Sequence, residues 1–250
     1  MIFRTKNMKV DFDKVALKLE GKDVERIGED CETNYFKFVG IHLDEYLSWE
    51  YQINHIHSKL SSGNFAIVQS KNFLPIKIRK TLYNSLFKSH LDYGILGWGN
   101  VSSGKLKRLR QIQKKCIRNV AGKNYRSHTD PIFSSLGLLK FDDLITYNSN
   151  TFMHKNVMGK LPVSFDDNFL CPLAPPNRTK GFRENNTRIK FLEQFPSYFL
   201  PKIWNNNSLF LKLIQSHKSF KKECFESLIK SYASHVRCDD YMCQDCFRQR

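Results

Sequence analysis

The amino-acid sequence predicts an α+β fold that is mostly helical, with a small β region at the amino-terminal end and a mixed region at the carboxy-terminal end. Two observations carry this prediction. Aromatic and β-branched residues alternate with a period of two between Tyr35 and Leu43, which is typical of a strand. After residue 48 the apolar residues instead recur every three or four positions, as they do on the buried face of a helix.

The amino-terminal segment is predicted to form short strands. Its apolar stretches lie at residues 1–5, 10–19 and 24–27, and Gly21-Lys22 favours a turn between the last two. The segment from Tyr35 to Leu43 carries the strongest strand pattern. Gly40 within it indicates a bulge or the close approach of another backbone.

The first helices are expected after Ser48, which is a residue type that caps helices. The apolar face of the first helix contains Trp49, Ile53, Ile56 and Leu60. Ser61-Ser62-Gly63 either ends this helix or lies within a longer one. Pro75 stands where a first-turn proline is typical. Behind it, a core stripe is predicted at Ile78, Leu82, Leu86 and, shifted by one position, Leu91.

Three further helices are predicted before residue 160. The first covers residues 102–121 and ends at Gly122, a common stop. Its apolar residues are Leu106, Leu109, Ile112, Cys116, Ile117 and Val120. Asp130-Pro131 begins a short helix, and Phe141 or Asp142 begins a longer one that extends through Met153.

The carboxy-terminal part is less regular. Four of the eight prolines lie within residues 161–185, which are therefore predicted to be a linker or a crossing segment. Short strands are expected near residues 188–191 and 198–199, and a last helix over residues 219–232. The predicted regions are a β region (1–47), a helical region (48–160), the linker (161–185) and a carboxy-terminal region with a cysteine-rich tail (186–250).

The charge of the chain is strongly positive and unevenly distributed. The formal net charge is +16, and residues 72–128 alone carry 13 Lys and Arg against one acid, a net of +12. A concentrated positive patch indicates a polyanionic partner such as nucleic acid. No apolar run is long enough for a membrane-spanning helix, and the first residues lack the apolar core of a secretory signal. Seven cysteines without such a signal favour an intracellular protein with reduced thiols, in the cytoplasm or nucleus and not secreted.

The predicted helix over residues 102–121 carries the densest part of this charge. Arg110, Lys114 and Arg118 recur at i, i+4 and i+8, away from the apolar face. The predicted phosphate contacts also include Lys105, Lys107, Arg108, Lys115, Lys123 and Arg126. The alternative is a solvated helix face, but such faces usually mix signs, and the single acid between Asn72 and His128 is Asp92. We therefore predict binding to backbone phosphates.

Two groups of residues suggest metal sites. Asp142-Asp143, Asp166-Asp167 and Asp239-Asp240 are carboxylate pairs, but none lies in the aromatic-x-Asp-Asp hairpin pattern of reverse-transcriptase-type polymerases, and Asp142-Asp143 is expected to open a helix. In the tail, His235, Cys238, Cys243 and Cys246 could hold zinc, although the spacing is unusual and free thiols are the favoured interpretation. No catalytic site and no metal site is predicted.

The order of several motifs resembles the segment that follows the catalytic hairpin in reverse transcriptases of non-LTR (LINE-type, jockey-like) retrotransposons. The resemblance covers nearly the whole chain and rests on the order and spacing of its motifs. They lie at residues 36–44, 47–49, 71–75, 82–86, 91–94, 98–99, 109–118, 125–133 and 201–205.

The resemblance implies a role for each region. Residues 1–47 would be the end of a palm, with a primer-grip turn at Phe38, Gly40, Ile41 and Leu43. Residues 48–160 would be the helical thumb, which contacts RNA, DNA or an RNA–DNA hybrid. The catalytic aspartates, and the Mg²⁺ that they bind, would belong to the missing palm and fingers, which are a further expected partner. No cofactor, membrane or small-molecule substrate is expected for this chain. The alternatives are a stand-alone basic nucleic-acid-binding module and a decayed element product without function.

Overall fold

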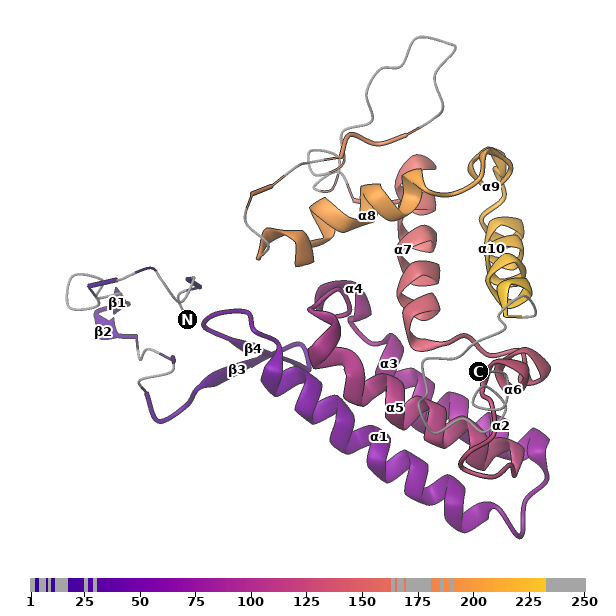
Figure 1. The fold of residues 1–250 in the computed structure, drawn as a ribbon. Coiled ribbons are helices and arrows are strands. Elements are labelled where there is room, and N and C mark those ends of the chain that lie inside the picture. Colours follow the sequence, from indigo (N-terminus) through magenta and orange to yellow (C-terminus); the bar gives the residue numbers. More distant parts are fainter. Residues whose placement is uncertain are drawn as a thin grey trace. The chain divides into compact units, whose positions relative to one another are not determined.

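A computed structural model of the chain describes residues 3–4, 8, 10–11, 18–24, 27–28, 31–162, 165, 169, 181–184, 187–188 and 191–232. Two compact units, residues 1–56 and residues 57–250, make up the chain (Figure 1). Helices predominate, and the described strands form two small antiparallel hairpins. The predicted mostly helical α+β fold is therefore confirmed. Within the described ranges, no helix has the length and apolar character needed to cross a membrane.

The first unit begins with a minimal hairpin around the predicted turn. β1 (Lys18–Leu19) pairs antiparallel with β2 (Lys22–Asp23). The connecting residues Glu20 and Gly21 both have positive φ angles, 51° and 80°. The turn is thus one residue earlier than Gly21-Lys22. Of the strand predicted over 24–27, Val24 and Ile27 are not in a strand, and most of the stretches predicted over 1–5 and 10–19 lie outside the described residues.

The segment from Tyr35 to Asp44 forms a second hairpin instead of the single predicted strand. β3 (Tyr35–Phe38) pairs antiparallel with β4 (Ile41–Asp44), with Phe38 opposite Ile41 across a two-residue turn. The turn residues Val39 and Gly40 have φ angles of 46° and 78°, and positive φ at both positions is what a type I′ turn requires. Gly40 therefore marks a turn and not a bulge. Alternating residues look the same in one long strand as in two strands joined by so short a turn.

The carboxylate of Asp44 organises the passage from this hairpin into the first helix. It accepts hydrogen bonds from the backbone N–H groups of Tyr46, Ser48 and Trp49 and from the Ser48 hydroxyl. Helix α1 (Glu50–Ser70) follows, and Ser48 Oγ accepts a hydrogen bond from the N–H of Glu50 at 3.3 Å, as expected of a capping residue. The predicted apolar face of α1 is buried.

Gly63 lies within α1, where the helix passes close to a π-helical turn. After Pro75 the chain forms α2 (Ile76–Tyr83), the π-helical turn η2 (Asn84–Lys88) and α3 (Ser89–Asp92). A Cβ atom on Gly63 would lie 2.7 Å from the carbonyl oxygen of Leu86 in η2. Of the two alternatives for Ser61-Ser62-Gly63, the longer helix is therefore the one observed, and its glycine permits the close approach.

The buried face of α2 and η2 is displaced by one residue from the predicted stripe. Tyr83, Phe87 and Leu91 are buried, whereas Ile78 and Leu86 are 43% and 39% exposed. The predicted stripe is therefore wrong at Ile78 and Leu86, whereas Leu82 is half-buried and the predicted Leu91 is buried. The inward position one turn before Tyr83 is taken by Arg79, whose Nη1 donates to the carbonyl oxygen of Asn119 at 2.9 Å. A search for apolar periodicity cannot detect a buried arginine that has a backbone acceptor.

The middle of the chain forms four helices. They are α4 (Ile95–Trp98), α5 (Ser103–Ala121), α6 (Asp130–Leu136) and α7 (Phe141–Val157). The first of them was not predicted, and the other three lie close to the predicted positions. Helix α5 packs on α2, α6 and α7. It ends at Gly122, which adopts a φ of 68°, as the predicted stop requires. Helix α7 extends one turn beyond the predicted Met153.

The carboxy-terminal region is helical where the structure describes it. The 3-10 turn η4 (Leu192–Gln194) precedes α8 (Pro196–Asn205), α9 (Leu209–Leu213) and α10 (His217–Ser231). The strand expected at residues 198–199 is thus wrong, because these residues belong to a helix that Pro196 initiates. Residues 189–190 of the other expected strand lie outside the described part. The predicted division of the chain into four regions stays a prediction.

A hydrophobic core joins these helices to α7, which stands between α8 and α10 in Figure 1. Met153 of α7, Trp204 of α8 and Phe220 of α10 are almost completely buried in it. Phe182, from the predicted linker, also contributes to this core. The side chain of Asn205 holds it there by accepting from the Phe182 N–H at 2.9 Å and donating to the Phe182 carbonyl oxygen at 2.8 Å.

Replacing Gly63 with alanine tests the close approach of α1 and η2. Alanine favours a helix over glycine by about 1 kcal/mol, but here its Cβ would collide with a backbone oxygen, and overpacking costs about 1–3 kcal/mol. We expect Gly63→Ala to lower the free energy of unfolding, measured by urea denaturation. The matched control is Gly104→Ala in α5, where a Cβ would meet no atom within 4 Å. This control should be neutral or stabilising, and a stabilising Gly63→Ala would contradict the close approach.

Candidate nucleic-acid interface

Helix α5 separates its apolar and cationic residues onto different faces, as the sequence predicts. Leu106, Leu109, Cys116, Ile117 and Val120 are all buried. On the opposite side Lys107, Arg108 and Lys115 are exposed, with the exposed amide of Gln111 between them. We call Lys107, Arg108 and Lys115 the exposed cationic face. No residue of α5 is acidic.

The cations predicted as the centre of the phosphate-binding stripe have other surroundings. Arg118 is only 7% exposed, and its Nε donates to the carbonyl oxygen of Ser127 at 2.8 Å. Arg110 forms an ion pair with Asp142 at 2.8 Å and also donates to the carbonyl oxygen of Ser103. The predicted i, i+4, i+8 row is therefore not the exposed row. The exposed row is displaced around the helix because Arg118 finds a backbone acceptor below the surface.

The remaining predicted cations surround α5. Lys114 is partly buried, whereas Lys105 is exposed on the first turn of the helix. Lys123 and Arg126 are exposed beyond the end of the helix, and the Arg126 guanidinium lies 5.3 Å from the centre of the Tyr125 ring. Their contact with nucleic acid stays a prediction.

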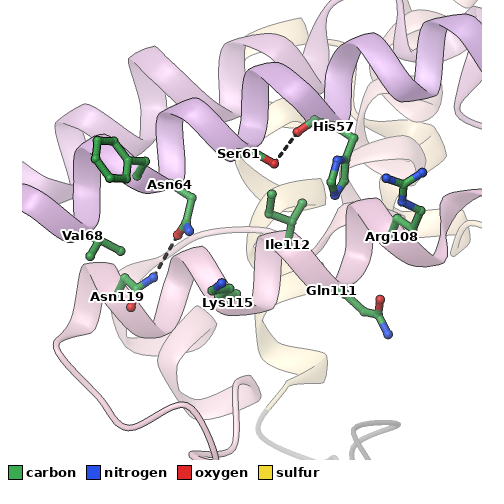
Figure 2. A pocket seen from close by; sticks show the side chains of 10 residues that line it. His57, Ser61, Asn64, Val68, Arg108, Gln111, Ile112, Lys115 and Asn119 are labelled. Atoms are coloured by element: carbon green, nitrogen blue, oxygen red, sulfur yellow. Dashed lines mark hydrogen bonds between the residues drawn. The ribbon is translucent and has the colours of Figure 1, made fainter.

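A groove of about 810 Å³ runs between α1 and α5 beside the exposed cationic face. Its lining residues come from α1 (His57, Ser61, Asn64, Phe65 and Val68) and from α5 (Arg108, Gln111, Ile112, Lys115 and Asn119). Figure 2 shows His57 and Arg108 extending toward each other at one end. Toward the other end, Asn119 Nδ2 donates to Asn64 Oδ1 at 2.9 Å. A direct hydrogen bond thus joins the two helices within the lining of the groove.

The electrostatics of this groove are positive. None of the ten described residues that line it is acidic, whereas Arg108 and Lys115 are both cationic. Burial, and then the charge of Arg108, lower the pKa of His57 below its ordinary value. His57 therefore lies in a site that disfavours its own protonation until an anion enters.

The α1 side of the groove was not predicted from the sequence. The weak signal lies in the residues between the apolar positions of α1, where His57, Ser61 and Asn64 follow one another at helical spacing. Phe65 and Val68 continue this row, but as apolar residues they suggest a core. Only the structure reveals that Phe65 is 63% exposed.

The residues that resemble a primer grip lie together on the second hairpin. Phe38 ends β3 and is 59% exposed, Gly40 is in the turn, and Ile41 and Leu43 are half-buried in β4. The rings of Phe36 and Phe38 lie 6.5 Å apart. The hairpin thus presents an apolar, aromatic tip.

The candidate metal ligands either form other contacts or lie outside the described residues. Asp142 and Asp143 lie in the first turn of α7, as predicted. Asp142 pairs with Arg110, and Asp143 accepts a hydrogen bond from the Tyr232 hydroxyl at 2.6 Å. The other two aspartate pairs, together with His235, Cys238, Cys243 and Cys246, lie outside the described residues. Within the described part of the chain, no three His, Cys, Asp or Glu side chains converge as metal ligands.

Replacing Arg118 with methionine tests its structural position. Methionine keeps an unbranched apolar chain but removes the donor to Ser127, and losing a buried hydrogen bond costs about 1–3 kcal/mol. We expect Arg118→Met to lower the free energy of unfolding by that amount. Lys107→Met, which removes an exposed charge from the same helix, should change it by no more than about 0.5 kcal/mol. Equal effects of the two substitutions in urea denaturation would place Arg118 at the surface.

Comparison with known proteins relates part of this chain to a polymerase of a mobile element. The chain is similar to a protein of Drosophila melanogaster named probable RNA-directed DNA polymerase from transposon X-element, with 23% identity over 124 residues. These residues make up 48% of this chain and 14% of that protein, so the chain matches a small part of the relative's length. No family model and no solved structure matches the chain. The similarity supports a reverse-transcriptase-related origin.

Proposed function

We propose that this chain is the nucleic-acid-binding, thumb-like part of a retrotransposon reverse transcriptase. It binds the backbone phosphates of RNA, DNA or an RNA–DNA hybrid. The observation that carries this proposal is the exposed cationic face of Lys107, Arg108 and Lys115 on a helix without acidic residues.

The charge balance around α5 favours a polyanionic partner. Asp92 is the single acid among residues 72–128, and it forms an ion pair with Lys88. Asp142 of α7 pairs with Arg110. Like charges on one helix repel each other, and bound phosphates relieve that repulsion while they release counterions from the nucleic acid. Since phosphates are the same at every position, this binding tolerates any base sequence.

The second hairpin is proposed as the primer-grip-like element. Its turn places Val39, a β-branched residue, at a φ of 46°, which is an unfavourable conformation for such a residue. Val39 and Phe38 are nevertheless 69% and 59% exposed. A strained turn with an exposed apolar tip is typical of a segment kept for a contact. By resemblance, that contact is with the end of a primer, through Phe38, Gly40, Ile41 and Leu43.

The proposal assigns binding, and not nucleotide transfer, to this chain. By resemblance the chain corresponds to the region after the catalytic hairpin. The described carboxylate pair, Asp142-Asp143, is engaged by Arg110 and Tyr232. The catalytic aspartates and their Mg²⁺ would be supplied by the palm of the polymerase.

The salt dependence of binding tests the role of the exposed cationic face. Each phosphate contact changes the slope of log K against log salt by about −0.7 to −0.9. We expect the triple change of Lys107, Arg108 and Lys115 to Gln to make this slope shallower by roughly 2 to 2.7. The affinity should fall equally for oligonucleotides of different sequence.

The matched control for this variant removes three exposed charges elsewhere. Lys218, Lys221 and Lys222 lie exposed on α10, where Glu226 pairs with Lys222 at 3.9 Å. Changing these three to Gln should leave the slope nearly unchanged. If the α5 variant keeps the wild-type slope while circular dichroism shows intact helices, the exposed cationic face does not bind phosphates.

A primer-extension assay tests the division between binding and chemistry. The purified chain, given a primed RNA template, the four dNTPs and Mg²⁺, should extend no primer, because the proposal places the catalytic aspartates in the palm. An active reverse transcriptase in a parallel reaction shows that the template and nucleotides are competent. Primer extension by this chain alone would overturn the assignment.

A further inference from the structure

The groove between α1 and α5 has a shape that suits one strand of nucleic acid. From His57 to Val68 it extends along about 16 Å of α1, at about 1.5 Å per residue. One stacked strand carries a phosphate about every 3.4 Å, so the groove matches about five nucleotides. The hydrogen bond between Asn64 and Asn119 joins the two helices toward one end of the groove.

The lining of the groove combines the two features that bind unpaired nucleic acid. Arg108 and Lys115 lie on one wall, where they can contact phosphates. Phe65 lies on the other wall with 63% of its surface exposed, so its ring is open to a ligand. Sites for single strands pair a positive groove with aromatic rings on which bases stack.

A duplex cannot make use of this ring. The bases of a duplex already stack on their neighbours, and only an unpaired base can offer its face to an aromatic side chain. The amides of Asn64, Gln111 and Asn119 add donors and acceptors to the lining without adding charge. The groove therefore has features that contact with a duplex backbone would not require.

We propose that the groove between α1 and α5 binds an unpaired stretch of about five nucleotides, with a base stacked on Phe65 and phosphates at Arg108 and Lys115. This inference rests on the proposed nucleic-acid binding and adds the single strand as the ligand of a defined site. The proposed single-strand site does not include Lys107, because Lys107 belongs to the exposed cationic face but does not line the groove.

His57 provides an independent signature of occupancy. The charged group that faces it is Arg108 of α5, and burial together with the charge of Arg108 lowers its pKa. A phosphate beside Arg108 offsets this positive charge and favours protonated His57. Binding in the groove therefore takes up a proton, and affinity should rise as the pH falls from 7.5 to 5.5.

The test compares a rhodamine-labelled ten-nucleotide oligouridine with a blunt RNA–DNA duplex by fluorescence anisotropy. Phe65→Leu removes the ring but keeps an apolar side chain. It should weaken single-strand binding about five-fold or more, the effect of losing one stacked base, and leave duplex binding unchanged. Phe73→Leu is the control, because Phe73 is 84% exposed outside the groove. It should change neither affinity.

Each outcome separates the groove from the proposed function. If Phe65→Leu binds the single strand as tightly as the wild type, the groove inference is wrong, while duplex binding by the wild type still supports the proposed function. If the wild type binds neither ligand, the proposed function fails and the groove inference fails with it. In the pH series, His57→Gln should abolish the gain in single-strand affinity at low pH. A full gain in that variant would show that His57 does not face the bound phosphate.

Discussion

The packing of the second unit, residues 57–250, depends on helix α5. This helix buries an apolar face although it carries seven basic residues and no acidic one. Such a helix cannot neutralise its own charges by i,i+4 pairs, so acceptors must come from other segments. The Ser127 carbonyl oxygen serves Arg118, and Asp142 at the start of α7 serves Arg110. The segments that follow α5 in the sequence therefore pack back against α5 itself. Lys107 and Lys115, which point outward, keep their charges at the surface, where an external anion can reach them.

Helix α1 is positioned from two sides by consecutive residues. Gly63 lets it approach the Leu86 carbonyl oxygen in η2, and the side chain of Asn64 bonds to Asn119 on α5. The first contact lets α1 lie close to η2, and the second joins α1 to α5. Phe65, the next residue, is thereby turned outward into the groove. The exposure of the Phe65 ring thus depends on the glycine two positions earlier, so the packing of α1 also shapes the candidate site.

The sequence predicts the elements of this chain better than it predicts their surfaces. Helix α5, its stop at Gly122 and the start of α7 follow from periodicity and capping residues. The errors occur where a side chain satisfies a backbone group that is distant in sequence. Arg79 and Arg118 look like surface residues until the carbonyl oxygens of Asn119 and Ser127 are found beside them. Arg79 takes an inward position of α2 that apolar spacing would not select, whereas α5 buries its predicted apolar face together with Arg118. The groove partners on α1 follow only from the packing of the helices.

The two proposed modes of binding share residues and therefore compete. Arg108 and Lys115 line the groove, and they also complete the exposed cationic face with Lys107. A strand in the groove engages two of the three cations of that face, so a duplex that approaches at the same time would retain Lys107 alone. Simultaneous occupancy would place two phosphate backbones around the same two side chains, and their mutual repulsion opposes it. Binding of a single strand in the groove and of a duplex on the exposed cationic face should thus be mutually exclusive. Such a surface would distinguish paired from unpaired regions of one nucleic acid by the ring of Phe65, since the phosphates are common to both.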